Sequence, residues 1–179
     1  MQMELQILNA IQSLRTPAGD FLMPIISNGI VLFPVVSLVL LIRKRTRKAA
    51  WIMIAAMVLD VVVCNVLLKN LFQRVRPCDV NTAVELLTAR PTDYSFPSGH
   101  TAFSFAAVSG LWFSGILKKW RVPAVAAACL ISFSRLYLYL HYPTDILAGA
   151  LAGVFCGWAA YRLYHRILEG TAAGKEAAA

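Results

Sequence analysis

Apolar residues occupy long uninterrupted stretches of this chain, and polar residues are largely confined to the short segments between them. Five of these stretches are almost free of charge and approach the roughly 20 residues that a helix needs to cross a bilayer. The pattern predicts transmembrane helices at about residues 21–42, 49–72, 97–117, 122–141 and 144–165. The predicted fold class is therefore all-α, an integral membrane helical bundle with five transmembrane helices.

The first 16 residues show a different pattern. Leu5, Leu8 and Ile11 recur at helical spacing, with polar residues such as Glu4 between them. This periodicity predicts an amphipathic helix over residues 1–16 that lies in the membrane interface. A signal peptide is the alternative, but the segment lacks a basic start before an apolar run and a small-residue cleavage site.

The composition agrees with a membrane protein. Of the 179 residues, 59% are hydrophobic and 15% are charged, and the mean hydropathy is +0.64. A water-soluble core does not need so many apolar residues. No internal repeat divides the chain, so residues 1–169 are predicted to form a single membrane domain and the Ala-rich residues 170–179 a disordered tail.

Lysine and arginine predict the orientation. They gather in the turns at residues 43–48 and 118–121, and the positive-inside rule makes the side that holds these turns cytoplasmic. The C-terminus falls on the same side, and the N-terminal helix faces outward. The net charge of +8 thus reflects topology. It does not indicate nucleic-acid binding, because neither an aromatic platform nor a soluble basic groove accompanies it.

Three short motifs hold most of the reactive side chains, and the predicted topology places all three on the outer side. They are Lys69-x6-Arg76-Pro77, Pro97-Ser98-Gly99-His100 and Ser134-Arg135-x5-His141-x3-Asp145. Together they supply three cations, two histidines and one carboxylate. Holding a phosphate dianion needs several fixed donors, and breaking its ester needs a nucleophile and a proton source. The motifs therefore predict a phosphate site.

The motif spacings also predict local geometry. Lys69 and Arg76 are seven residues apart, about two helical turns, so both could share one helical face, although Pro77 disfavours helical geometry at Arg76 and ends the run. Ser98 is expected to cap the helix whose first turn holds Gly99 and His100. Such a helix start binds anions through its free amides.

The histidines are expected to divide the chemistry. His141 and Asp145 are four residues apart, close enough for the carboxylate to receive one ring N–H and to leave the other ring nitrogen as a nucleophile. His100, on the far side of the pocket, would protonate the departing oxygen. Each residue alone is typical of a helix cap or a membrane interface, but their joint occurrence favours a catalytic site.

In this order and spacing, the three motifs resemble those of the type 2 phosphatidic acid phosphatase (PAP2) superfamily over roughly residues 21–165. The resemblance implies a phosphatase of the bacterial cytoplasmic membrane that uses no metal and no cofactor, with its site facing the extracytoplasmic side. It implies a phosphohistidine on His141, His100 as general acid and Asp145 as the orienting carboxylate. Phosphate binding is implied for Lys69, Arg76, Ser98, Gly99 and Arg135.

The placement of the site also predicts the substrate class. A site between helices at the outer edge of the bilayer would take a phosphorylated headgroup while the lipid tail stays in the membrane. The resemblance suggests undecaprenyl diphosphate, phosphatidylglycerophosphate or phosphatidic acid, and the outward orientation favours the first. A phosphotransferase with the same intermediate and a non-enzymatic module that binds or transports phosphate lipids are the alternatives. The oligomeric state stays open.

Two further patterns have structural interpretations. Three acids of the loop before the second motif are scattered, which is typical of solvated residues and unlike a Mg²⁺ site; they are Asp79, Glu85 and Asp93. A GxxxGxxxG stripe in the fifth predicted span favours close packing inside the bundle over a dimer contact; it comprises Gly149, Gly153 and Gly157.

Overall fold

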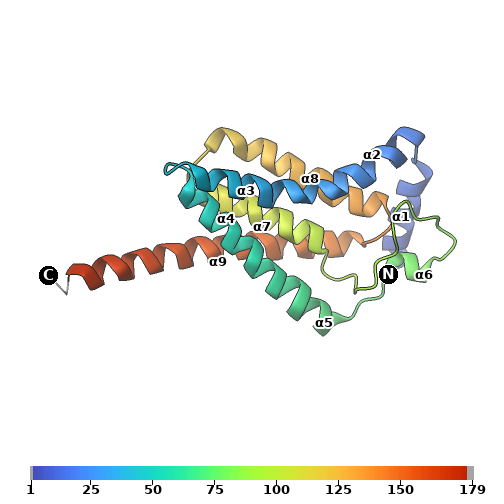
Figure 1. Cartoon of the computed structure of the whole chain (residues 1–179). Helices are drawn as coiled ribbons and strands as arrows, with labels where there is room; N and C mark the ends of the chain where they lie inside the picture. Colours follow the sequence, from blue (N-terminus) through green and yellow to red (C-terminus); the bar gives the residue numbers. More distant parts are fainter. Residues whose placement is uncertain (1, 177–179) are drawn as a thin grey trace.

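A computed structural model describes residues 2–176, with side chains described as far as Leu168. Every regular element in this part of the chain is helical (Figure 1), which confirms the all-α class. The elements are α1 (Gln2–Ser13), α2 (Pro17–Asn28), η1 (Gly29–Val31), α3 (Leu32–Ile42), α4 (Arg47–Asp60), η2 (Val61–Leu68), α5 (Lys69–Phe72), α6 (Pro77–Val80), α7 (Gly99–Phe113), η3 (Lys118–Trp120), α8 (Arg121–Tyr137) and α9 (Pro143–Glu176).

Three segments among the described residues are long and apolar enough to cross a membrane: Pro17–Ile42, Arg47–Val80 and Pro143–Leu168. The other two predicted spans form shorter helices, since α7 has 15 residues and α8 has 17. Helix α7 is central, and α4, α8 and α9 pack around it (Figure 1). Most of its side chains are therefore buried against protein.

The first predicted span consists of two α-helices joined by the short 3-10 helix η1. Helix α3 restarts after this turn with Pro34 in its first turn. Proline is tolerated there because the first backbone N–H groups of a helix have no intrahelical partner.

The second predicted span changes its helical form along its length. Helix α4 continues into the π-helix η2 and then into α5. The side chains of Asn65 and Lys69 point toward Gly99, since a Cβ there would lie 2.8 Å from Asn65 Oδ1 and 3.8 Å from Lys69 Nζ. The helix ends where Gln73 adopts the left-handed conformation, with φ of 46°. This break directs the following residues back over the end of the bundle.

Helix α9 packs along α7 through the glycine stripe. A Cβ on Gly149 would lie 2.7 Å from the carbonyl oxygen of Ser98, and the other two glycines of the stripe lie similarly close to α7. The predicted packing inside the bundle is confirmed. The close approach brings the starts of the two helices together, and the Ser98 N–H donates to the Asp145 carbonyl at 3.0 Å.

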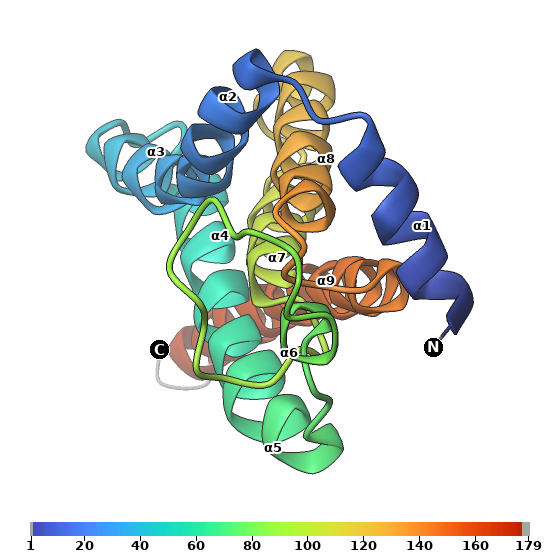
Figure 2. The same ribbon diagram turned by 90° about the vertical axis from the view of Figure 1, so that its right-hand side faces the viewer.

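Helix α1 lies at the same end of the bundle as the loop between α6 and α7 (Figure 2). Leu8 is completely buried there. Gln12 donates to the Tyr137 carbonyl at 2.8 Å, and Asn9 accepts a hydrogen bond from Tyr139 at 2.7 Å. The N-terminal helix is thus part of the end of the bundle at which the three motifs meet.

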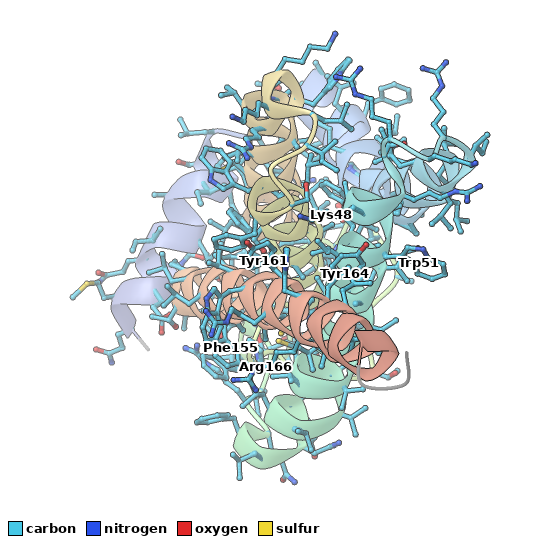
Figure 3. The ribbon with its side chains drawn as sticks, turned by 90° about the vertical axis from the view of Figure 1, so that its left-hand side faces the viewer. Lys48, Trp51, Phe155, Tyr161, Tyr164 and Arg166 are labelled. Atoms are coloured by element: carbon cyan, nitrogen blue, oxygen red, sulfur yellow. The ribbon has the colours of Figure 1, made fainter. Side chains whose placement is uncertain are left out.

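The opposite end carries the basic turn between α3 and α4. Seen from that end (Figure 3), Lys48 and Trp51 lie beside the C-terminal half of α9, near Tyr164. Helix α9 extends past the rest of the bundle (Figure 1) and runs to Glu176, so it includes residues 170–176 of the predicted tail. Residue 1 of the predicted interfacial helix and residues 177–179 of the tail lie outside the described part of the chain.

Candidate active site

The first motif does not lie on one helical face. Lys69 is the first residue of α5, whereas Arg76 follows the turn at Gln73 in extended backbone, with φ of −73° and ψ of 152°. The possible shared face is not formed, because the helix ends before Gln73, and the extended backbone of Arg76 agrees with the predicted effect of Pro77 on the residue before it. The two buried cations still converge, since both donate to the carboxylate of Asp93.

The ring of His141 is held from both sides. Its Nδ1 lies 2.8 Å from the carbonyl oxygen of Ser95, and its Nε2 lies 3.1 Å from Nη1 of Arg76. A carbonyl only accepts and a guanidinium only donates, so the proton belongs on Nδ1 and Nε2 presents a lone pair. The residue is 1% exposed, so protein atoms surround the ring almost completely.

Asp145 lies behind this ring in the first turn of α9. Its Oδ2 is 3.5 Å from Nδ1 of His141, longer than the bond to Ser95. The carboxylate is completely buried and accepts from the Ser95 hydroxyl at 2.5 Å and from the Tyr142 N–H at 2.9 Å. Asp145 is therefore a charge adjacent to the ring, and the closest acceptor of the ring N–H is a backbone carbonyl.

The second motif forms the start of α7. Ser98 occupies the N-cap position, but its hydroxyl makes no capping bond and instead accepts from Thr101 at 3.1 Å. Gly99 and His100 begin the helix and line a cavity. A Cβ at residue 99 would lie 2.8 Å from Asn65 Oδ1, so a larger residue there would displace the end of the Asn65 side chain.

The third motif completes the cluster of cations. Arg135, near the end of α8, is 7% exposed and donates from Nη1 to the hydroxyl of Ser27 at 2.6 Å. Helix α8 ends at Tyr137, and the left-handed residue Tyr139, with φ of 59°, turns the chain. This turn places His141 between α8 and α9, beyond the end of the helix in which the sequence had predicted it.

These side chains surround a single cavity of about 680 Å³. Six of the eight predicted site residues line it: Lys69, Arg76, Gly99, His100, Arg135 and His141. Ser98 and Asp145 do not line the cavity and support it from behind. One wall is apolar and comes from η1, α3, η2 and α7, with Ile30, Val31, Pro34, Val61 and Phe103. The cavity thus has a cationic region and an adjoining apolar region.

Asp93 is the cavity residue that sequence reasoning missed. The sequence interpretation of Asp93 as a solvated loop acid holds for its exposure, since the side chain is 52% exposed. It missed the pairing of this carboxylate, which accepts from Lys69 and, at 2.6 Å, from Arg76. Partial burial alone would raise the pKa of Asp93, but the Lys69 hydrogen bond and the charges of Arg76 and Lys69 outweigh it and lower the pKa to about 2. A carboxylate therefore occupies the cation cluster that the motifs assign to phosphate.

Two supporting residues were missed as well. The carbonyl of Ser95 orients His141, and a backbone contact of this kind leaves no signal in the side-chain sequence. Arg74 lies inside the first motif and donates to Asp145 at 2.5 Å. The only available signal was that Arg74 adds a third cation to a motif in which two had assigned roles.

Among the described residues, no group of three or more histidine, cysteine or acidic side chains is arranged to hold a metal ion. The cavity itself presents cations and histidines with a single carboxylate. That donor set suits an anion, since Lys and Arg donate hydrogen bonds and carry positive charge.

Comparison with known proteins gives one family. The model of the family described as the PAP2 superfamily matches residues 49–169. The chain is 39% identical to the undecaprenyl-diphosphatase of Sulfolobus acidocaldarius over 69% of its own length and 58% of that protein's. It is 29% identical to the lipid A 4'-phosphatase of Bacteroides thetaiotaomicron over 90% of its own length and 77% of that protein's. The chain thus spans less than two thirds of the Sulfolobus relative.

Two solved structures have the same fold. The crystal structure of Aquifex aeolicus LpxE superposes with a TM-score of 0.75 and 30% sequence identity, covering 88% of this chain and 94% of that one. A transmembrane PAP2 type phosphatidylglycerolphosphate phosphatase from Bacillus subtilis superposes with a TM-score of 0.76. The superposition covers 93% of this chain and 86% of the Bacillus subtilis chain. The two sequences are 22% identical, so this likeness concerns the fold alone.

Proposed function

The chain belongs to the PAP2 superfamily, and on this premise we propose that it hydrolyses the terminal phosphate of a lipid phosphate or diphosphate through a phosphohistidine on His141. The observation that carries the proposal is the position of His141 Nε2. Its lone pair faces Arg76 at 3.1 Å in a cavity that also holds Lys69, Arg135 and His100. A nucleophile and the donors for its target phosphate thus share one site.

In the first step Nε2 of His141 forms a bond to phosphorus, and the bond from phosphorus to the lipid oxygen breaks. His100 gives its proton to that oxygen, so the lipid leaves as an alcohol or a monophosphate. Lys69, Arg76 and Arg135 bind the equatorial oxygens, where charge lies during phosphoryl transfer. Gly99 lets a phosphate oxygen approach the amides at the start of α7.

In the second step water attacks the phosphohistidine, and His100 accepts a proton from that water. The bond from phosphorus to Nε2 breaks and inorganic phosphate leaves, which restores both histidines. The Ser95 carbonyl holds the His141 ring in the same tautomer before and after the cycle, and the charge of Asp145 stabilises the positive charge that the ring gains as a phosphohistidine. Three fixed cations and a helix start provide the charge stabilisation for which other phosphatases use metal ions.

The apolar wall of the cavity supports a lipid substrate. It continues into a groove of about 250 Å³ between α3 and α4, and the two spaces share Pro34, Val61 and Phe103. The groove is otherwise lined by Leu38, Ile54, Met57 and Val58. A headgroup bound to the cations would leave its tail in this groove, in contact with the bilayer.

We further propose that residues 1–169 are one membrane domain in a bacterial cytoplasmic membrane. Five spans at about residues 21–42, 49–72, 97–117, 122–141 and 144–165 would place the site on the extracytoplasmic side and the C-terminus in the cytoplasm. The basic turns at residues 43–48 and 118–121 support this orientation. An outward site favours undecaprenyl diphosphate as the substrate.

The test is a comparison of kcat/KM for purified protein over undecaprenyl diphosphate, phosphatidylglycerophosphate, phosphatidic acid and lipid A. We expect release of inorganic phosphate with all the substrates that fit, and the highest value with undecaprenyl diphosphate. Transfer of labelled phosphate to a second lipid instead of to water would identify a phosphotransferase. Binding of all four lipids without turnover would identify a binding module.

A further inference from the structure

Arg74 bonds with three partners at the rim of the site without lining the phosphate cavity. Its Nη1 donates to Oδ1 of Asp145 at 2.5 Å and to the hydroxyl of Thr144 at 2.7 Å. Its Nη2 donates to Oε2 of Glu4 at 2.6 Å. The guanidinium carbon also lies 3.9 Å from the centre of the Tyr142 ring. Arg74 therefore links α1, the start of α9 and the segment that carries Arg76.

The contact with Arg74 determines how Asp145 is oriented. Oδ1 bonds with Arg74, while Oδ2 accepts from the Ser95 hydroxyl and the Tyr142 N–H. With both oxygens held, the carboxylate has one orientation, in which Oδ2 faces His141 at 3.5 Å. Asp145 is 0% exposed, so without Arg74 its charge would be buried beside no other full positive charge at bonding distance.

Arg74 is itself held by the N-terminal helix. Oε1 of Glu4 accepts from the hydroxyl of Thr144 at 2.6 Å and from its N–H at 3.3 Å, while Oε2 accepts from Arg74. Burial alone would raise the pKa of Glu4, but the hydrogen bonds from Thr144 and Arg74 outweigh it and lower the pKa. Glu4 is thus ionised at neutral pH and pairs with Nη2 of Arg74, whereas Asp145 pairs with Nη1.

The backbone of Arg74 joins the same network. Its carbonyl accepts from the N–H of Ser95 at 2.8 Å, and the carbonyl of Ser95 accepts from Nδ1 of His141. The main chain of Arg74 thus contacts Ser95 and its side chain contacts Asp145, the two residues that lie next to Nδ1 of His141.

We propose that Arg74 is a positioning residue that holds Asp145 against His141, and that Glu4 extends this function to the N-terminal helix. The inference rests on the proposed function, because it assigns Asp145 a part in turnover at His141. Arg74 contacts neither the cavity nor the substrate phosphate. Its loss therefore lowers kcat while KM stays close to the wild-type value.

The first measurement compares Arg74→Gln and Arg74→Lys with the wild type. We expect kcat to fall by about 10- to 100-fold in Arg74→Gln, as for other groups that hold a functional side chain from behind. Arg74→Lys restores part of the loss, because an ammonium keeps the charge but not the fork of donors. The matched control is Arg121→Gln. Like Arg74, Arg121 lies over an aromatic ring and donates a short hydrogen bond, in this case to the Trp112 carbonyl at 2.6 Å. It lies at the other end of α8 and should keep wild-type kcat.

The deciding measurement is a double-mutant cycle with Asp145→Asn. If Arg74 acts through Asp145, Arg74→Gln in the Asp145→Asn background costs less than about 3-fold in kcat, since the group it positions is already lost. Equal losses in both backgrounds would overturn the inference and leave Arg74 a purely structural residue. Should Arg74→Gln fail to fold, Arg74→Lys carries the same cycle.

Two outcomes separate this inference from the proposed function. In one outcome, Asp145→Asn and His141→Ala are strongly impaired, but the kcat losses of Arg74→Gln and Asp145→Asn simply add. That outcome would reject only the role of Arg74. Wild-type kcat in Asp145→Asn and His141→Ala would reject the proposed site itself. Glu4→Gln should reduce kcat less than Arg74→Gln and lose its effect in the Arg74→Gln background, and an independent effect there would disconnect α1 from the site.

Discussion

Nδ1 of His141 lies 2.8 Å from the backbone carbonyl oxygen of Ser95. Because that oxygen only accepts, the contact fixes the ring tautomer without help from any titratable group. It also explains why Asp145 can remain 3.5 Å away and still contribute, since its charge acts on the ring through a short distance in a buried site. The main chain therefore orients the proposed nucleophile, and a carboxylate lies next to its ring.

Replacing His141 by alanine tests whether its Nε2 is the nucleophile. His141→Ala should lower phosphate release by at least ~10³-fold, because the variant lacks the proposed nucleophile. Acid-quenched wild type should retain radiolabel from a labelled substrate, and the variant should not. The control is His165→Ala, which removes a histidine from α9 that does not line the cavity. Near-normal turnover in purified His141→Ala would contradict the mechanism.

Asp93 should compete with substrate for the cations. In Asp93→Asn the KM for the lipid phosphate and the inhibition constant of inorganic phosphate should both fall by about 2- to 5-fold, the effect of losing a half-exposed ion pair. With a pKa of about 2, Asp93 is negative throughout the assay range, so the ratio of variant to wild type should stay constant between about pH 5 and 8.

The control for this variant is Glu85→Gln, an exposed acid of the same loop that does not line the cavity. It should leave both constants unchanged. A rise in KM in Asp93→Asn would show that Asp93 supports the cations and does not compete for them.

The approach of α9 to α7 makes Gly149 sensitive to substitution. In Gly149→Ala the new Cβ would lie 2.7 Å from the Ser98 carbonyl, a backbone atom that cannot rotate away. Overpacking of this kind costs about 1–3 kcal/mol, and the helix starts that hold Asp145 and His100 must separate. We expect a lower Tm together with reduced kcat. Gly29→Ala is the control, because its Cβ would meet only Ile131 at 3.9 Å.

The membrane class and the chemistry of the site follow directly from the sequence, for physical reasons. Long apolar runs have few stable alternatives to helices in a bilayer, and the residues that bind phosphate must carry the charges and donors themselves. Lys69, His100 and Arg135 therefore stand out as side chains. The glycine stripe is equally direct, because only a close helix contact requires a missing Cβ at regular spacing.

The remainder depends on contacts that side-chain identity does not encode. The left-handed conformation of Gln73 breaks the expected helix and brings Arg76 to the site by an extended path. Ser95 acts through its carbonyl, which every residue has. Asp93 enters the cavity because its loop folds back over the end of the bundle, and the loop sequence has no periodicity from which that path follows.

The cation cluster predicts how the enzyme responds to chelation. Lys69, Arg76 and Arg135 line the cavity, and in the proposed mechanism their positive charges supply the stabilisation that Mg²⁺ gives elsewhere. EDTA should therefore leave the rate of phosphate release unchanged within about twofold. Inhibition by EDTA that Mg²⁺ alone reverses would contradict this prediction.

The orientation of the site in the membrane is testable with introduced cysteines. Native Cys78 is a poor reporter because it is 1% exposed in the cluster that holds Leu8. Thr82 lies exposed in the loop over the site, and Lys44 lies exposed in the basic turn at the opposite end. In a cysteine-free background, an impermeant maleimide should label Thr82→Cys in intact cells and Lys44→Cys only after lysis, because the positive-inside rule retains the basic turn in the cytoplasm. Labelling of Lys44→Cys but not of Thr82→Cys in intact cells would invert the orientation and place phosphate release in the cytoplasm.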